Sequence, residues 1–255
     1  MDGWQGLDDE LDAWAGAGRV ASLWWRDDDA TGDGMALRRL LTLVGGMRIP
    51  LALAVIPAEA RADLADPLST SPDTTVLQHG WNHSNRSLPP ARKAELTAGR
   101  PWGEVMAELV RGRERLAALF AGRFLPVMVP PWNRIDAQLI PHLPAAGFRG
   151  LSTCKARISA EPVPGLRQVN CHADPVDWRG NRGFAGAEAV LRTIVDHLRA
   201  RRTGLADAGE PTGILTHHLV HDEPAWTFLA DLAARVCRHA GGQWISLGAA
   251  LEPTR

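Results

Sequence analysis

The sequence predicts an α/β protein built as a barrel of parallel strands. Short apolar runs alternate along the chain with longer segments of helical spacing, and this alternation favours a parallel sheet. About eight runs qualify as strands, a number that suits a closed barrel better than an open sheet. No repeat, linker or low-complexity block divides the 255 residues, so we expect a single barrel domain over residues 1–255.

The expected strands are short apolar runs that end at polar or turn residues. The first covers residues 20–25 (VASLWW) and ends in the charged run RDDD. The second covers residues 50–56 (PLALAVI). The other candidates share this pattern and span residues 74–77, 125–129, 150–153, 169–171, 213–216 and 244–247.

The expected helices lie between these runs. Residues 35–44 have helical spacing, and Gly45-Gly46 marks their end. Residues 104–121 form the longest amphipathic segment, with Pro101 at its start and apolar residues spaced for one face. Further helical segments are expected at residues 58–65, 135–146, 185–200 and 226–239.

Composition excludes several classes of protein. A hydrophobic fraction of 45% and a charged fraction of 22% are ordinary for a globular protein, and a net charge of −1 provides no basic surface for nucleic acid. The three cysteines form no C-x-x-C pair, which favours reduced thiols in a cytosol. The N-terminus has no signal-like pattern, and no apolar run approaches the length of a membrane span. We therefore expect a cytoplasmic protein without a nucleic-acid partner or a membrane span.

Polar residues collect where four of the apolar runs end. These clusters are Asp27, Asp28 and Asp29; His79 and His83; Asp174 and Asp177; and His217 and His218. The carboxyl ends of parallel strands share one face, and that face holds the active site in such folds. We expect the four clusters to converge there.

Each cluster has a chemical and a structural interpretation. Histidines four apart, as in His79 and His83, can bind one cation, although an isolated pair is often surface loop. Three adjacent carboxylates raise one another's pKa unless a cation or an arginine compensates them; the alternatives are a solvated run or a helix cap. Strand alternation sends Asp27 and Asp29 to one side and Asp28 to the other.

The last cluster and three tryptophans complete the candidate site. A histidine at the end of residues 213–218 (GILTHH) can act as a general acid beside a carboxylate, or it can be a core histidine bonded to a carbonyl. Trp81, Trp132 and Trp178 each lie beside one cluster. Their aromatic faces suit sugar rings, while packing at the top of the barrel is the alternative.

In chain order, the clusters resemble the five motifs of the polysaccharide deacetylases, the NodB-homology family or carbohydrate esterase family four. Those motifs are T-F-D-D-G, H-[ST]-x-x-H, R-P-P-[YW], D-x-x-D-W and L-x-H. The corresponding stretches here are RDDDA (26–30), HGWNH (79–83), VPPW (129–132), DPVDW (174–178) and LTH (215–217). Five motifs in order, over nearly the whole chain, make the resemblance specific.

The resemblance implies a deformed (β/α) barrel of seven or eight parallel strands that binds one divalent metal ion, zinc first, with cobalt or nickel as alternatives. It implies metal ligands at Asp29, His79 and His83. The general base would be Asp28 and the general acid His217, with Asp174 tuning the site. The resemblance implies that Trp132 and Trp178 shape the groove, and we expect Trp81, Pro131 and His218 to bind substrate with them. The aspartate triplet also permits a second alignment, in which Asp27 is the base and Asp28 the ligand.

The sequence departs from the family pattern at three points. Val129 stands where the third motif has arginine, and Arg26, Arg134 or Arg179 could replace that cation. Gly80 stands where the second motif has Ser or Thr, and the first motif lacks its glycine. These departures indicate a divergent member of the family.

The predicted function is metal-dependent removal of an N-acetyl or other acyl group from an amino sugar or related glycan. A cytoplasmic location favours a small N-acylated sugar or a lipid-linked glycan precursor as the substrate. Two alternatives remain: hydrolysis of an amide or ureide C–N bond in a non-sugar metabolite, and a non-catalytic carbohydrate-binding barrel.

Overall fold

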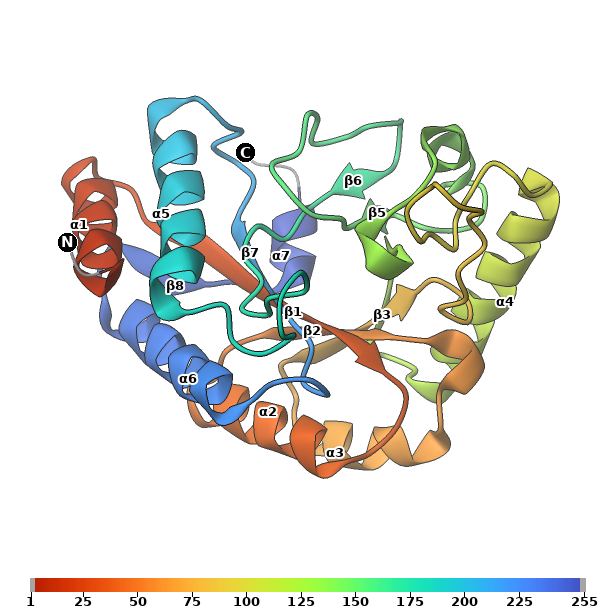
Figure 1. Cartoon of the computed structure of the whole chain (residues 1–255), viewed down its shortest axis with the longest axis horizontal. Coiled ribbons are helices and arrows are strands. Elements are labelled where there is room, and N and C mark those ends of the chain that lie inside the picture. Colours follow the sequence, from red (N-terminus) through yellow and green to blue (C-terminus); the bar gives the residue numbers. More distant parts are fainter. Residues whose placement is uncertain (1–2, 253–255) are drawn as a thin grey trace.

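The fold is organised around one sheet of eight strands, shown in Figure 1. The computed structural model describes residues 3–252. The order of the strands is β6-β5-β4-β3-β2-β1-β7, β8 also pairs with β1, and every pairing between these strands is parallel. The strands are β1 (Ala21–Ala30), β2 (Leu51–Val55), β3 (Thr74–His79), β4 (Phe124–Val129), β5 (Gly150–Leu151), β6 (Arg167–Gln168), β7 (Thr212–Thr216) and β8 (Gly242–Trp244).

The segment after β6 closes this sheet into a deformed barrel. Residues 169–173 continue from β6 toward β7, where Ala173 forms a parallel bridge with Ile214. The amide of Leu215 donates to the carbonyl of Ala173 at 2.8 Å. At this seam Gly213 lies against the opposing backbone, and a Cβ there would stand 2.5 Å from the carbonyl oxygen of Asn170. The predicted parallel barrel is therefore confirmed, with its last pairing made by isolated bridges.

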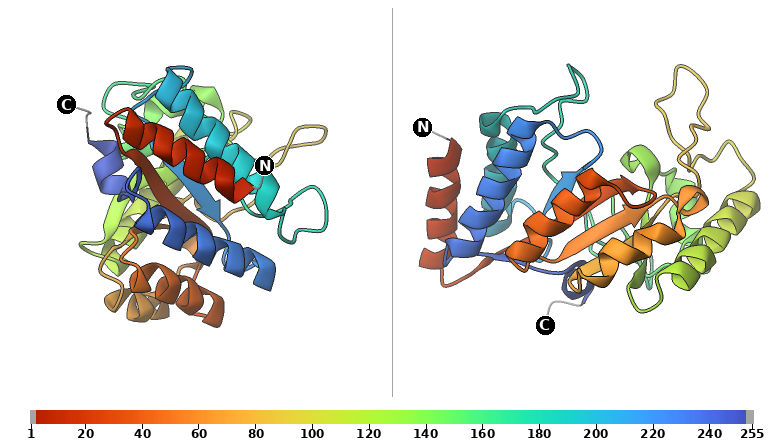
Figure 2. Two further views of the ribbon diagram at one scale, coloured as in Figure 1. Left: turned by 90° about the vertical axis from the view of Figure 1, so that its left-hand side faces the viewer. Right: turned by 90° about the horizontal axis from the view of Figure 1, so that it is seen from below.

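The longer helices and α3 follow one another in an arc around one side of the sheet (Figure 1). In that order they are α1 (Gly3–Gly16), α5 (Ala187–Thr203), α6 (Glu223–Arg238), α2 (Met35–Gly46), α3 (Ala65–Ser69) and α4 (Trp102–Leu119). A short helix, α7 (Leu247–Leu251), follows β8. Figure 2 shows α1 lying against α5. None of the helices within residues 3–252 is long and apolar enough to span a bilayer.

Strand alternation separates an outer core from a small interior core. On β1, Leu23 and Trp25 pack outward with the apolar faces of the helices. Trp24 points the other way and joins Ala52, Leu77 and other apolar residues inside the barrel. Residues Arg26 and Asp28 continue the inner face of β1 by the same alternation. The site is therefore built directly on the interior core.

Several predicted elements differ in the structure. Strand β1 runs through the aspartates to Ala30 because partners inside the fold compensate their charges. Residues 58–65 and 135–146 form mainly short 3-10 turns, and Pro141 lies inside the second of these regions. These turns are η1 (Pro57–Glu59), η2 (Ala62–Leu64) and η4 (Ala137–His142). Helix α1, which buries Leu7, Leu11 and Trp14, was not predicted.

Candidate active site and metal centre

Three of the predicted residues form a group that could hold a metal ion. The ligand atoms of Asp29, His79 and His83 all lie within 4.8 Å of one another. Oδ1 of Asp29 is 3.1 Å from Nε2 of His79 and 3.4 Å from Nε2 of His83. The side chain of His79 is 2% exposed, whereas those of His83 and Asp29 are 23% and 32% exposed. The group is thus anchored in the barrel and open on its outer side.

The backbone directs these three side chains toward one another. Nδ1 of His79 contacts the carbonyl oxygen of Val129 at 3.0 Å; the carbonyl can only accept, so Nδ1 carries the proton and Nε2 is free as a ligand. The pairing of β1 with β2 shifts register between Asp27 and Ala30, and Asp29 has a φ of 71°. His83 also has a positive φ, of 54°. A bulge of this kind re-aims a side chain, here the carboxylate of Asp29 toward the two histidines.

The charge of the Asp29 carboxylate is favoured by its neighbours. Burial raises the pKa of Asp29, but the contact with His79 and the charges of the surrounding histidines outweigh burial and hold this pKa well below the usual value. The same negative charge would attract a cation.

Asp28 is paired with an arginine from its own strand. Nη2 of Arg26 donates to Oδ2 of Asp28 at 3.0 Å, and Nε lies 2.8 Å from Oδ1 as an ion-pair contact without hydrogen-bond alignment. Arg26 is fully buried and also donates to Ser152 and Asn133. Of the three candidates, Arg26 therefore supplies the missing cation, while Arg134 donates to the carbonyl of Lys93. Val129 packs in the interior core.

Asp27 has a different set of partners. Its carboxylate accepts from the hydroxyl of Thr216 at 2.7 Å, from the amide of His218 at 3.0 Å and from Nδ1 of His218. The geometry thus favours the alignment in which Asp28 and Asp29 are the base and the ligand. His218, expected among the substrate-binding residues, is 3% exposed and paired with Asp27.

His217 lies beside Asp174 and Trp178. Its Nδ1 is 3.6 Å from Oδ2 of Asp174, and that oxygen accepts from Nε1 of Trp178 at 2.7 Å. The ring of Trp178 meets the ring of His217 edge-on at 4.7 Å. Burial raises the pKa of Asp174 above its usual value, against the opposing charge of His217. Asp177 instead accepts backbone amides of its own turn.

The remaining predicted residues surround the metal-ligand group in different ways. Trp132, in η3 (Pro131–Asn133), has its ring 4.3 Å from that of His83. The guanidinium of Arg111 on α4 lies over the ring of Trp81 at 4.3 Å. Pro131 is buried and lies close to Gly80. Trp132 and Trp178 are thus the tryptophans beside the candidate ligand and acid.

Glu95 is a site residue that the sequence analysis missed. Its Oε1 accepts from the amides of Trp81 at 2.6 Å and Asn82 at 3.3 Å, inside the segment between the two histidines. Gly80 has a φ of 58°, and a Cβ there would lie 2.6 Å from Pro131 and 2.7 Å from Oε2 of Glu95. A carboxylate from a distant loop therefore holds this turn, and no local pattern marks it.

The possible ligand atoms of a second group, His172, His197 and Glu210, also lie within 4.8 Å of one another. The amide of Gly213 donates to Nδ1 of His172 at 2.9 Å, so this nitrogen is unprotonated and Nε2 carries the proton of the neutral ring. Glu210 accepts the amides of Arg157 and Asn170, and Nε2 of His172 lies 3.5 Å from it. A protonated Nε2 cannot bind a metal. The hydrogen bonds of this group instead connect the loops beside β7.

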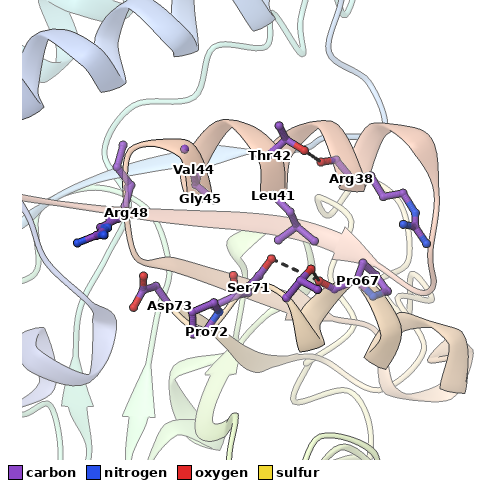
Figure 3. Close-up of a pocket in the computed structure, with 14 residues that line it drawn as sticks. Arg38, Leu41, Thr42, Val44, Gly45, Arg48, Pro67, Ser71, Pro72 and Asp73 are labelled. Atoms are coloured by element: carbon purple, nitrogen blue, oxygen red, sulfur yellow. Dashed lines mark hydrogen bonds between the residues drawn. The ribbon is translucent and has the colours of Figure 1, made fainter.

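A groove on the surface lies away from these residues. Figure 3 shows it between α2 and residues 67–74, lined by Leu41, Arg48 and Asp73 among others. Its lining reaches Ile49 and Thr74, at the amino ends of β2 and β3. The candidate site is at the opposite, carboxyl ends of the strands.

Comparisons with solved structures identify the fold. A Mycobacterium smegmatis protein assigned as a polysaccharide deacetylase superposes with a TM-score of 0.67 at 17% identity, over 92% of this chain and 90% of that one. The chain has the polysaccharide deacetylase fold. No protein-family model and no curated protein matches the sequence.

Two further structures share this deacetylase fold. A Clostridium thermocellum family 4 acetyl xylan esterase in complex with cobalt superposes with a TM-score of 0.54 at 14% identity, over 90% of this chain and 89% of that one. A Streptomyces lividans family 4 carbohydrate esterase in complex with acetate gives 0.54 at 15% identity, over 88% and 90%. These likenesses establish the architecture predicted from the sequence.

Proposed function

We propose that this protein is a metal-dependent hydrolase that removes an N-acetyl or other acyl group from an amino sugar or related glycan. The observation that carries the proposal is the convergence of four separate sequence clusters at the carboxyl ends of the strands. There a possible ligand group, an arginine-paired carboxylate and a histidine beside a carboxylate occupy one end of the barrel. The esterase and deacetylase structures with the same fold support this chemistry.

The proposed ligand set fits a divalent transition metal. Two imidazole nitrogens and one carboxylate oxygen suit zinc, with cobalt or nickel as alternatives. The orientation of His79, whose Nδ1 donates to a carbonyl, leaves Nε2 available as such sites require. When bound, the ion polarises the acyl carbonyl and lowers the pKa of water. Asp29, His79 and His83 would hold it.

Asp28 is the proposed general base. Arg26 faces both of its oxygens, with Nη2 donating to Oδ2 and Nε lying 2.8 Å from Oδ1, and it supplies the positive charge that a fully buried carboxylate requires. Each carboxylate oxygen has more than one acceptor site, so capacity remains to accept a proton from the attacking water. The base is thereby oriented before substrate arrives.

His217 is the proposed general acid. Attack of water on the amide carbon gives a tetrahedral intermediate, whose C–N bond breaks as His217 donates a proton to the departing nitrogen. Oδ2 of Asp174, 3.6 Å from Nδ1 of His217, lies on the side of the ring that faces away from its Nε2. Free amine and acetate, or another carboxylate, result.

The aromatic rings beside the site favour a sugar as the substrate. Trp178 is 44% exposed and Trp132 is half-buried, and such faces can stack on a pyranose ring. In a cytoplasmic single-domain protein, the substrate would be a small N-acylated sugar or a lipid-linked glycan precursor.

The first test is the metal content of the purified protein, measured beside a His79→Ala/His83→Ala variant. We expect one zinc, cobalt or nickel ion per chain in the wild type and loss of that ion in the variant. If neither protein takes up metal on reconstitution, the proposal fails in favour of a non-catalytic barrel.

Two further variants separate the proposed base from the proposed ligand. We expect Asp28→Asn to lower acetate release from N-acetylated sugars by at least about 10²-fold while metal content stays unchanged. Asp29→Asn should lower metal content as well as activity. Unimpaired activity in both variants would reject the assignment.

A further inference from the structure

The position of His217 is set mainly by hydrogen bonds of Thr216 and His218, the residues before and after it. Nδ1 of His217 has no hydrogen bond from the residues described, because Asp174 lies 3.6 Å away, and the ring otherwise meets the edge of Trp178. Its backbone amide meets Nε2 of His221 at 3.2 Å. The direction of this side chain therefore depends on how the backbone before and after it is fixed.

Asp27 fixes that backbone on both sides. It is fully buried and pairs in register with Thr216, the last residue of β7. Its Oδ2 accepts from the Thr216 hydroxyl at 2.7 Å and from the His218 amide at 3.0 Å, while Oδ1 accepts from Nδ1 of His218. Trp25 extends the network by donating its indole N–H to the Thr216 hydroxyl at 2.9 Å. One carboxylate thus binds the residues on either side of His217.

The Asp27 carboxylate and the His218 imidazole compensate each other's charge. A buried carboxylate is costly unless a positive group and several donors compensate it. His218 provides the opposite charge, and Thr216 provides a further donor. Asp27 stands where the family's first motif has phenylalanine, and His218 follows the L-x-H motif, so neither belongs to the motif set.

We propose that Asp27 is a positioning residue that locks the turn after β7 and thereby aims His217 at the nitrogen of the departing amine. The proposal rests on the function proposed above, because it assigns His217 the proton donation. By strand alternation, Asp27 lies on the outer face of β1, whereas Asp28 and the interior core lie on the other face. It therefore acts through the backbone of residues 216–218 and does not contact substrate.

A positioning role for the acid predicts a dependence on the leaving group. Release of an amine requires a proton from the acid as the C–N bond breaks. Release of 4-nitrophenolate from an aryl acetate breaks a C–O bond to a stable anion, which needs no proton. Loss of the lock should therefore slow amide hydrolysis far more than hydrolysis of the activated ester.

The experiment compares Asp27→Ala and Asp27→Asn with the wild type on an N-acetylated amino sugar and on 4-nitrophenyl acetate. For Asp27→Ala we expect kcat on the amide to fall by about 10²-fold, since a misaimed catalytic group costs about that much, with KM and metal content unchanged. Loss on the ester should stay below about 10-fold. Asp27→Asn, which keeps one acceptor oxygen, should give an intermediate kcat on the amide. Asp196→Ala, at an exposed position of α5, is the control.

Hydrogen exchange provides a second measurement that does not depend on activity. The His218 amide should exchange faster in Asp27→Ala, while amides in β2 and β3 stay protected. Equal loss on both substrates, loss of metal, or unchanged exchange at His218 would overturn the positioning role. If the wild type hydrolyses neither substrate, the proposed function fails, and exchange alone then decides whether Asp27 holds the turn.

Discussion

At the scale of single residues, Asp27, Asp28 and Asp29 show how adjacent identical side chains acquire different partners. Alternation along β1 separates Asp27 from Asp28, and the bulge at Asp29 turns the third carboxylate toward the histidines. Asp27 binds residues after β7, Asp28 binds Arg26, and Asp29 meets His79 and His83. Each of the three carboxylates therefore has its own compensating partner, which offsets the repulsion among their negative charges.

Glu95 provides a prediction at this scale. Its carboxylate accepts two amides of the turn between the candidate ligands, so Glu95→Ala should weaken metal binding by about 10-fold or more. Glu95→Gln retains an acceptor oxygen, so its metal affinity should stay close to that of the wild type. Competition with a chromogenic chelator measures the affinity, and exposed Glu114→Ala serves as the control. Equal affinities in all variants would remove Glu95 from the site.

The candidate ligands could be predicted from the sequence because Asp29 and the pair His79 and His83 each follow an apolar run closely. The residues that these side chains contact could not be predicted. Arg26 was one of three possible cations, and only the fold shows that it reaches Asp28. Glu95 lies 12 residues beyond His83 in a segment without regular structure, so its contact depends on how that loop folds back.

At the scale of elements, α5 and β7 are joined by a buried histidine. His197 on α5 contacts Thr212 at the start of β7 through Nδ1 at 2.9 Å and stacks on His172 with ring centroids 3.4 Å apart. Burial, together with the charges of His172 and Arg201, lowers the pKa of His197 to about 2. The pairing therefore requires a neutral imidazole.

This requirement predicts a loss of stability in acid. Below the ordinary histidine pKa of about 6.5, the unfolded chain binds a proton that folded His197 does not, so the free energy of unfolding falls as pH falls. The contribution is about 1.4 kcal/mol per pH unit between about pH 6 and pH 4.5. In urea denaturation, the free energy of unfolding of His197→Gln should fall less steeply with decreasing pH than that of the wild type, by about 1.4 kcal/mol per pH unit. Identical slopes in both proteins would contradict the assignment.

Elements with strong periodicity were predicted well, and proline-rich ones were not. The periodic segment at 104–121 forms α4, and the apolar run at 125–129 forms β4. The segment at 135–146 has apolar spacing, but Pro141 lies within it and only a 3-10 turn forms. The first strand was predicted too short, because compensation of Arg26 and the aspartates is a tertiary effect.

At the scale of the whole molecule, closure of the barrel depends on a close approach at Gly213. A Cβ at this position would lie 2.5 Å from Nε1 of Trp24 and 2.5 Å from the carbonyl oxygen of Asn170, two groups that hydrogen-bond each other at 3.0 Å. Gly213→Ala should therefore lower the free energy of unfolding by about 1–3 kcal/mol. Gly103→Ala on α4, where nothing lies within 4 Å, should be neutral or stabilising. Urea denaturation of both variants tests this, and equal stability would show that the seam accommodates a methyl group.

The position of Arg26 has a consequence for finding related genes. Because the cation that compensates Asp28 comes from two residues earlier on the same strand, the residue before Pro130-Pro131 is free to be apolar. A search pattern that demands arginine before the double proline would discard chains built this way. A pattern that accepts arginine two positions before the paired aspartates, together with H-G-W-x-H, would retain them.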